Sequence, residues 1–360
     1  MNILIASRPI APPWDSGSMN MAYALATQLA ERHVVYIPVL RNFTPESKKL
    51  VARPIYTNRQ FCLLQKIRLF AYLLTSPPVD VLQFFFAPNL LTATIASSLL
   101  RLRRVPSVLT LTHTCLPNRP PHVFGTHVVT YSAYHADLLR RAGIENVSQI
   151  PPGVDERTVH PGLKGDEIGR ELGIPPEAPV VLYAGEYSNS ATLEALITAV
   201  DFCGRESSAL RFVFACRVRN RNERQRQAKI AEHIHGAGWG KQVLMLETVP
   251  QMRELIARAD VCILPLRNTY GKVDLPLFLL EAMAMAKPIV VTEIPPLVEL
   301  VDGATGLVVP VGNGMALAEA IQRMLTDGRE YGIRGRQMIE RMFTIKRVSL
   351  LYETLYMELT

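Results

Sequence analysis

The sequence has 360 residues, of which 48% are hydrophobic and 20% are charged, and its formal net charge is +7. This length suits two domains of ordinary size, and the composition excludes an intrinsically disordered chain. The five cysteines show no CxxC or metal-ligand spacing, which favours reduced thiols in a cytoplasmic protein over a disulfide scaffold or a metal site.

The first half of the chain predicts alternating strands and helices. Apolar runs predict strands at 2–6, 33–39, 79–86, 107–111 and 126–130, and helical spacing predicts helices at 19–30, 89–101 and 133–142. No charged n-region precedes the first run, so we expect a strand there and not a secretory signal. Asp80, Gln83 and Pro88 interrupt the longest nearly apolar stretch, which indicates a strand, a turn and a helix instead of a membrane span.

Positive charge is concentrated in the first 160 residues, which carry 16 Lys/Arg against 8 Asp/Glu. Residues 48–104 contain nine basic residues and one acid, and residues 58–74 interleave basic and apolar side chains like an amphipathic helix. Such a helix can lie on an anionic membrane surface, or it can pack on the core with a solvated basic face, and both readings stay open. No nucleic-acid partner is expected, because no recognition motif accompanies these residues.

Proline and glycine cluster at 150–162 and predict a linker, after which the alternation restarts. Strands are expected at 180–184, 210–215, 243–246, 261–264, 289–291 and 307–309, with helices at 191–202, 223–235, 251–259 and 275–286 and again after 314. Such alternation gives parallel sheets covered by helices on both faces. We therefore predict an α/β protein of two Rossmann-like, doubly wound parallel-sheet domains that face each other across a cleft.

The segment 271–292 (GKVDLPLFLLEAMAMAKPIVVT) is the most informative part of the sequence. A polar loop leads into a helix N-terminus, whose free backbone N–H groups suit a phosphate. Glu281 lies further into this helix among apolar neighbours, where an acid needs a hydrogen-bond partner such as a sugar hydroxyl. The alternative is a core helix that carries one acid on its solvent-facing edge.

A second loop, at 12–20 (PPWDSGSMN), joins the first expected strand to the first helix. Gly17 permits close approach of the backbone to a ligand, and Asp15 or Ser16 is suited to cap the helix. A single glycine in a turn is equally compatible with a purely structural role.

The restart of the alternation, the IPPGVD linker, the LLEAMAMAKPIVVT helix and strand, and the ATGLVVPVGN loop resemble family 4 of the retaining nucleotide-sugar glycosyltransferases, which have the GT-B fold. The resemblance covers essentially the whole chain and is strongest over 150–315. It implies an acceptor-side domain at 1–155, a nucleotide-sugar donor domain at 156–340, and a last helix within 341–360 that crosses back to the N-terminal domain. It also implies that neither a metal nor a cofactor is required.

Within the paired-acid motif of that family, Glu281 matches the second glutamate, which holds the nucleotide ribose. Val273 stands where the first glutamate is expected. Asp274, one residue later, is the candidate to substitute for it as a catalytic acid; alternatively, the loop through Leu275 and Pro276 binds the donor by its backbone N–H groups alone.

The family usually places an arginine and a lysine after the first strand of the C-terminal domain, where they bind the pyrophosphate. This chain has Gly185 followed by EYSNS there, without either cation. Because a diphosphate needs compensating charge, we consider Arg217, which follows a strand, and Lys272, in the loop before the Glu281 helix, as replacements. Each is also compatible with an ordinary surface cation.

On the N-terminal side, the loop with Asp15, Ser16 and Gly17 corresponds to the family's glycine-rich loop, and His113 matches a histidine near the transferred sugar. The resemblance implies transfer from a nucleotide diphosphate sugar with retention of anomeric configuration, the leaving phosphate taking the proton of the acceptor. The basic N-terminal half suggests a glycan or lipid-linked acceptor and a peripheral position on the inner face of a membrane.

Two other classes of function were weighed against this one. The absent cation pair and Val273 also fit a catalytically inactive glycosyltransferase-like binding subunit or partner protein. A nicotinamide-dependent oxidoreductase is disfavoured, because no GxGxxG follows a predicted strand.

Overall fold

The computed structural model describes residues 1–12, 14, 16–87, 89–115, 122–187, 190–270 and 273–360. The chain divides into two compact units. Unit 1 comprises Met1–Asp155, Thr269–Pro276 and Phe343–Thr360, and unit 2 comprises Glu156–Asn268 and Leu277–Met342. Two predicted site residues, Asp15 and Lys272, lie outside the described residues.

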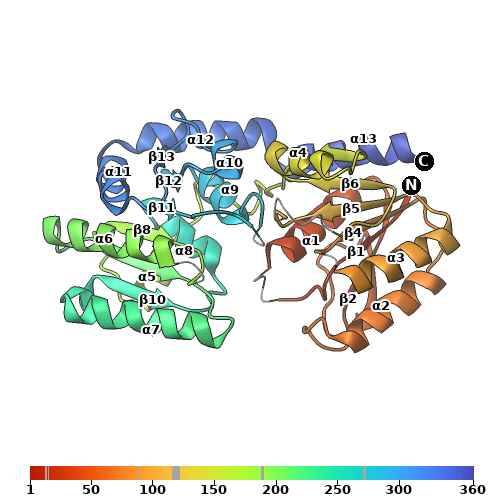
Figure 1. Ribbon diagram of the computed structural model, residues 1–360, viewed down its shortest axis with the longest axis horizontal. Coiled ribbons are helices and arrows are strands. Elements are labelled where there is room, and N and C mark those ends of the chain that lie inside the picture. The colour runs from red at the N-terminus through yellow and green to blue at the C-terminus, as the bar shows by residue number, and fades with distance from the viewer. Residues whose placement is uncertain (13, 15, 88, 116–121, 188–189, 271–272) are drawn as a thin grey trace. The chain divides into compact units, whose positions relative to one another are not determined.

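Unit 1 is built on a seven-stranded parallel sheet with the strand order β3-β2-β1-β4-β5-β6-β7. Its strands are β1 (Asn2–Ala6), β2 (Val34–Leu40), β3 (Leu50–Tyr56), β4 (Val81–Phe85), β5 (Ser107–Leu111), β6 (His127–Thr130) and β7 (Val147–Gln149). Its helices are α1 (Gly17–Leu29), α2 (Leu63–Thr75), α3 (Leu90–Arg103), α4 (Ala133–Arg141) and α13 (Ile345–Leu359). In Figure 1, α2 and α3 run side by side along this sheet.

Unit 2 repeats the plan with a six-stranded parallel sheet of order β10-β9-β8-β11-β12-β13. Its strands are β8 (Val180–Tyr183), β9 (Arg211–Ala215), β10 (Val243–Leu246), β11 (Val261–Leu264), β12 (Ile289–Thr292) and β13 (Leu307–Val309). The helices are α5 (Asp166–Glu171), α6 (Ser190–Glu206), α7 (Arg221–Gly236), η1 (Trp239–Lys241), α8 (Met252–Arg258), α9 (Leu277–Ala284), α10 (Pro295–Val298), α11 (Gly314–Asp327) and α12 (Arg329–Met342).

The predicted fold class, two Rossmann-like parallel-sheet domains, is confirmed. In each sheet the order reverses once, between β1 and β4 and between β8 and β11. The inner strands are the continuous apolar runs that a sheet covered on both faces requires, and Ile3, Leu4 and Ile5 of β1 are fully buried. Ligands of such sheets bind at the carboxyl ends of the strands next to the reversal.

Several elements were missed by the sequence prediction, among them β3 in unit 1. Pro54 interrupts its apolar pattern and cannot donate to a strand ladder. The structure resolves this conflict by placing β3 at the edge of the sheet, beside β2 alone.

The last helix, α13, belongs to unit 1 and packs against α1. Two buried tyrosines fix it to the sheet: Tyr356 Oη donates to Gln83 Oε1 at 2.9 Å, and Tyr352 Oη lies 2.9 Å from Thr110 Oγ1. The polar side chains of β4 and β5 therefore have a structural use, which is to bind the returning helix.

Candidate functional site

The carboxyl end of β5 is extended by a segment from the second half of the chain. Residues 269–276, between β11 and α9, belong to unit 1. Within this segment Val273 forms an isolated β-bridge with His113, and Tyr270 forms one with Thr114. The backbone N–H of Asp274 donates to the carbonyl of Thr112 at 3.0 Å. The loop that leads to the Glu281 helix is thus joined to the predicted sugar-side histidine by backbone pairing.

Asp274 is fully buried in this region. One carboxylate oxygen accepts from the Oγ of Ser132 at 2.8 Å and from the Oγ1 of Thr114 at 3.0 Å, and the other accepts from the Ser132 backbone N–H at 2.8 Å. His135 Nδ1 lies 3.6 Å from the second oxygen. Both oxygens are therefore occupied by protein donors, a placement that favours positioning of the loop over direct contact with a substrate.

His113 is half-buried, and its Nδ1 lies 2.8 Å from the hydroxyl of Thr112. That contact holds one ring nitrogen. His113 and the backbone of Val273 therefore lie next to each other. Both positions were identified from the resemblance to the glycosyltransferase family. Of the two residues that follow, Leu275 is buried and Pro276 is partly exposed just before α9.

Glu281 lies in α9, on unit 2, and its partner is an arginine of α8. Arg253 Nε donates to Glu281 Oε1 at 3.0 Å. Only 14% of the Glu281 side chain is exposed, against 42% for Arg253. Burial raises the pKa of Glu281 above its ordinary value, and the charge of Arg253 limits the rise. The largely buried acid therefore has an ionic partner in α8, and no sequence pattern pointed to this arginine.

Gly185 lies two residues after the end of β8, and its lack of a side chain has a local cause. A Cβ at this position would lie 2.2 Å from the phenol oxygen of Tyr183. That oxygen donates to the carbonyl of Glu186 and accepts from its N–H, both at 3.2 Å. Glycine is needed here to fit the tyrosine ring, whatever else this loop binds.

Three arginines gather around the loop at 185–187, at the carboxyl ends of β8 and β9. Arg217 forms a backbone bridge with Glu186, Arg219 forms an ion pair with Glu186, and Arg226 donates to the carbonyl of Tyr187 at 3.1 Å. We call these three residues the arginine cluster. Arg217 was predicted from the sequence, whereas Arg219 and Arg226 were missed, since only the fold shows that α7 and the residues before it return to this loop.

The N-terminal loop differs from expectation in one detail. Gly17 is the first residue of α1, and Ser16 occupies the N-cap position, but the Ser16 side chain does not cap the helix. Its hydroxyl instead lies 3.2 Å from that of Ser18. Of the two residues expected to cap the helix, Ser16 does not do so and Asp15 lies outside the described residues. A role for this loop in ligand binding stays a prediction.

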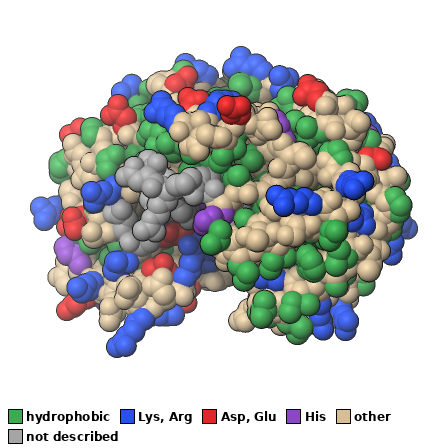
Figure 2. Space-filling model, turned by 45° about the vertical axis from the view of Figure 1, so that its right-hand side comes forward, with side chains coloured by type: hydrophobic (Ala, Val, Ile, Leu, Met, Phe, Trp, Pro, Cys, Tyr) green, Lys and Arg blue, Asp and Glu red, His purple; other side chains and the backbone are tan. Residues whose placement is uncertain are grey.

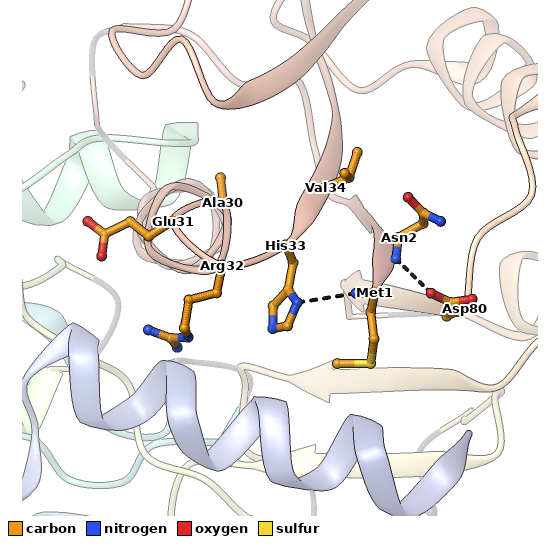
Figure 3. A pocket seen from close by; sticks show the side chains of 8 residues that line it. All are labelled: Met1, Asn2, Ala30, Glu31, Arg32, His33, Val34 and Asp80. Atoms are coloured by element: carbon orange, nitrogen blue, oxygen red, sulfur yellow. Dashed lines mark hydrogen bonds between the residues drawn. The ribbon is translucent and has the colours of Figure 1, made fainter.

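A separate shallow pocket in unit 1 lies at the opposite, amino end of the sheet (Figure 3). The chain's first amino group lies 3.3 Å from His33 Nδ1 there, and Asp80 accepts the backbone N–H of Asn2 at 2.7 Å. Because ligands of parallel α/β sheets bind at the carboxyl ends, this pocket is not a candidate for the donor site.

Within the described residues, no group of three or more His, Cys, Asp or Glu side chains is placed to hold a metal ion. No described helix is both long and apolar enough to span a bilayer.

Comparison with known proteins gives a consistent result. Residues 178–327 match the family described as glycosyl transferases group 1. The α-maltose-1-phosphate synthase of Mycobacterium tuberculosis is 28% identical over 230 residues, which cover 58% of this chain and 57% of that protein. A D-inositol 3-phosphate glycosyltransferase of Xylanimonas cellulosilytica is 27% identical over 202 residues, covering 53% and 46%. The chain thus spans about half the length of these curated relatives.

Among solved structures, the sucrose-phosphate synthase of Thermosynechococcus elongatus has a TM-score of 0.77 at 18% identity, covering 99% of this chain and 98% of that one. The Anabaena protein HepE, in complex with UDP and glucose, has a TM-score of 0.74 at 16% identity, covering 98% of each chain. At these identities the likeness establishes the fold.

Proposed function

We propose that the chain is a glycosyltransferase of the GT-B fold that transfers a sugar from a nucleotide diphosphate sugar to an acceptor, because residues 178–327 match the glycosyl transferases group 1 family. The observation that carries the proposal is this domain match. It spans the arginine cluster, Arg253 and Glu281, which lie near strand ends or in a helix that follows one. We propose that they form the donor site.

In this proposal the arginine cluster takes the place of the family's arginine and lysine. Guanidinium groups suit phosphate oxygens, because they offer paired donors and a permanent charge. Glu281 accepts hydrogen bonds from ribose hydroxyls, and Arg253 keeps its carboxylate oriented. The neighbour HepE is described in complex with UDP, which makes UDP the first nucleotide to test.

We extend the proposal to a retaining, metal-independent reaction. The leaving diphosphate accepts the acceptor's proton, so the protein need not supply a base. Its contribution is to stabilise charge that grows on the diphosphate as the bond to the sugar breaks. The arginine cluster and the backbone N–H groups at the start of α9 are the groups suited to this task.

The acceptor is proposed to be a glycan or a lipid-linked glycan, bound mainly by unit 1 near His113. Asp274 then acts as a positioning residue, because its buried hydrogen bonds hold the loop beside His113. A cytoplasmic enzyme at a membrane surface would meet such an acceptor, and the basic residues at 48–104 are compatible with that location.

Calorimetric titration with UDP and with GDP tests the donor site. We expect one nucleotide to bind the wild type and to bind Glu281→Ala and Arg217→Ala more weakly. Arg140→Ala, which removes an exposed arginine of α4 paired with Asp137, is the matched control and should bind like the wild type. If neither these nucleotides nor others bind the folded protein, the donor site is refuted.

Turnover is tested separately with the nucleotide sugar of the base that binds. Anomeric product analysis by NMR then distinguishes retention from inversion. Binding without transfer to any glycan or lipid-linked glycan would instead favour the inactive binding subunit.

A further inference from the structure

The helix α2 exposes apolar side chains on the side that faces away from the sheet. Leu63, Leu64 and Ile67 are 68%, 50% and 54% exposed, and Leu74 is 41% exposed. The buried face of the same helix contains Leu69 and Leu73 but also the polar Gln65. A helix that only packed on the core would show the opposite distribution, with polar residues outside.

The neighbouring helix α3 continues this surface. Leu90, Leu91, Ile95 and Leu102 are 65%, 63%, 42% and 75% exposed. The two helices contact each other, and the Arg103 guanidinium at the end of α3 donates to the carbonyls of Ser76 and Pro77, just after α2. We call the eight exposed residues of α2 and α3 the α2–α3 face. A group of exposed apolar side chains on two neighbouring helices marks a binding site more often than apolar side chains that are scattered singly.

The hydroxyl groups on these helices need little water. Thr75 Oγ1 donates to the carbonyl of Ala71, Thr94 Oγ1 to that of Leu90, and Ser98 Oγ to that of Thr94. A hydroxyl that bonds to its own helix can enter an apolar environment at lower cost than one that depends on solvent. The exposed hydroxyls therefore do not oppose burial of the α2–α3 face.

Charge identifies the partner. Arg59, Arg101 and Arg104 are exposed near the ends of the two helices, and Lys66 lies on α2. The one acid between Lys48 and Arg104 is Asp80, whose carboxylate accepts the Asn2 N–H at the amino end of the sheet. In Figure 2 hydrophobic side chains gather at the lower right with Lys and Arg side chains among them. A cationic rim without acids complements a negative surface.

We propose that the α2–α3 face binds the surface of an anionic phospholipid bilayer, with the leucines and Ile67 inserted at the level of the headgroups and the arginines against phosphate groups. The combination of exposed leucines and positively charged side chains is what interfacial helices require. A second copy of this chain would present the same positive charge to itself, so a self-contact at this face would be repulsive. The inference does not depend on the sugar-transfer proposal, because these residues lie outside the donor site.

Sedimentation with vesicles tests this inference on the full chain at physiological salt. We expect binding to vesicles that contain phosphatidylglycerol and weak or no binding to phosphatidylcholine alone. The double variant Ile67→Asp/Leu91→Asp should lose binding by roughly tenfold or more, because insertion then buries two carboxylates. Arg101→Glu should bind at least roughly fivefold more weakly, because it removes a cation that contributes about that factor near an anionic surface and adds an anion. Binding of the wild type should also weaken at high salt.

Matched controls come from elsewhere in unit 1. Met357, 60% exposed on α13, supplies Met357→Asp, and the exposed Arg141 of α4 supplies Arg141→Glu; both should sediment like the wild type. Unchanged circular dichroism and nucleotide binding of each variant would show that it is folded. The proposal is overturned if the wild type ignores anionic vesicles, if the face variants bind as well as the controls, or if the face variants instead abolish a dimer of a chain that does not bind vesicles.

Discussion

Ser132 and Asp274, which lie 142 positions apart in the sequence, are joined by two hydrogen bonds of 2.8 Å, one from the backbone N–H of Ser132 and one from its hydroxyl. Ser132 also caps α4 by accepting from the His135 N–H. The carboxylate therefore fixes the start of α4 and the loop at 269–276 to each other, and with that loop the stretch that pairs with His113.

Replacement of Asp274 separates positioning from catalysis. Asp274→Ala leaves the Ser132 N–H and two hydroxyls without their acceptor in a buried site, so we expect unfolding free energy to fall by roughly 2–4 kcal/mol. Asp274→Asn should cost much less, because its amide oxygen can accept from the Ser132 N–H while the hydroxyls turn to accept from the amide N–H groups. Urea denaturation of the two variants measures the difference.

The turnover of the same variants shows whether Asp274 positions the loop or takes part in catalysis. If Asp274 only positions the loop, we expect the kcat of Asp274→Asn to be close to that of the wild type. A well-folded Asp274→Asn whose kcat drops by about 100-fold or more at unchanged KM would instead make it a catalytic group.

The raised pKa of Glu281 predicts a definite pH dependence. Its folded state holds a proton at pH values where the unfolded chain, with the ordinary value of 4.5, has released it. The folded state then binds more protons, so the contribution of Glu281 to stability falls as pH rises from 4.5 through the raised value and is constant above it. Relative to Glu281→Gln, the wild type should lose stability over this interval.

Denaturation of both proteins across this pH range provides the measurement, and Arg253→Ala the control. Without Arg253, burial is less well offset and the loss of stability should extend to higher pH. A wild type that gains stability relative to Glu281→Gln over the interval would show that the ion pair outweighs burial.

The arginine cluster is expected to act on the phosphates and not on the nucleoside. Arg219→Ala should weaken UDP binding roughly tenfold, since it removes a charge-assisted contact, and should change uridine binding little. Glu186→Gln should leave UDP binding equal or stronger, because Glu186 holds Arg219 in an ion pair. Calorimetry with both ligands tests this, and equal losses for UDP and uridine in Arg219→Ala would argue that the residue only supports the loop.

Hydrophobic periodicity predicted the strands and helices better than motif matching predicted the contacts of the site. Local periodicity predicted β1, β5, β10, β11 and β13 at their observed bounds, because strands covered on both faces are short apolar runs between turn residues. Periodicity did not predict β3, because Pro54 interrupts the apolar pattern of this edge strand. It also missed β7 and α10, which are too short to show a hydrophobic period.

The site depended on contacts that no local pattern encodes. Arg253 became the partner of Glu281, and Ser132 that of Asp274, only through the packing of distant segments. Asp274 was selected because it stands beside the position of the expected glutamate, whereas its burial follows from the packing of the loop on unit 1. Arginines at helix starts resemble ordinary surface cations, which is why Arg219 and Arg226 were missed.

Glu353 of α13 joins the last helix to the rest of unit 1 through Arg32 and His33. Its carboxylate accepts from Arg32 Nη2 at 2.8 Å and lies 2.6 Å from His33 Nε2. Burial alone would raise its pKa, but the hydrogen bonds and charges of Arg32 and His33 outweigh it and hold the pKa below the ordinary value of 4.5. The stabilisation is therefore present above that value and is lost as pH falls through the lower, folded one.

We expect Glu353→Gln to speed hydrogen exchange of the α13 amides at neutral pH, because the free energy of opening this helix falls by about 1–2 kcal/mol. The difference from the wild type should shrink in acid, because the wild-type carboxyl is then neutral as well. Glu358→Gln removes an exposed acid from the same helix and should leave exchange almost unchanged. Equal exchange in the two variants at neutral pH would mean that α13 is held by its buried tyrosines, through Gln83 and Thr110, and not by this charged cluster.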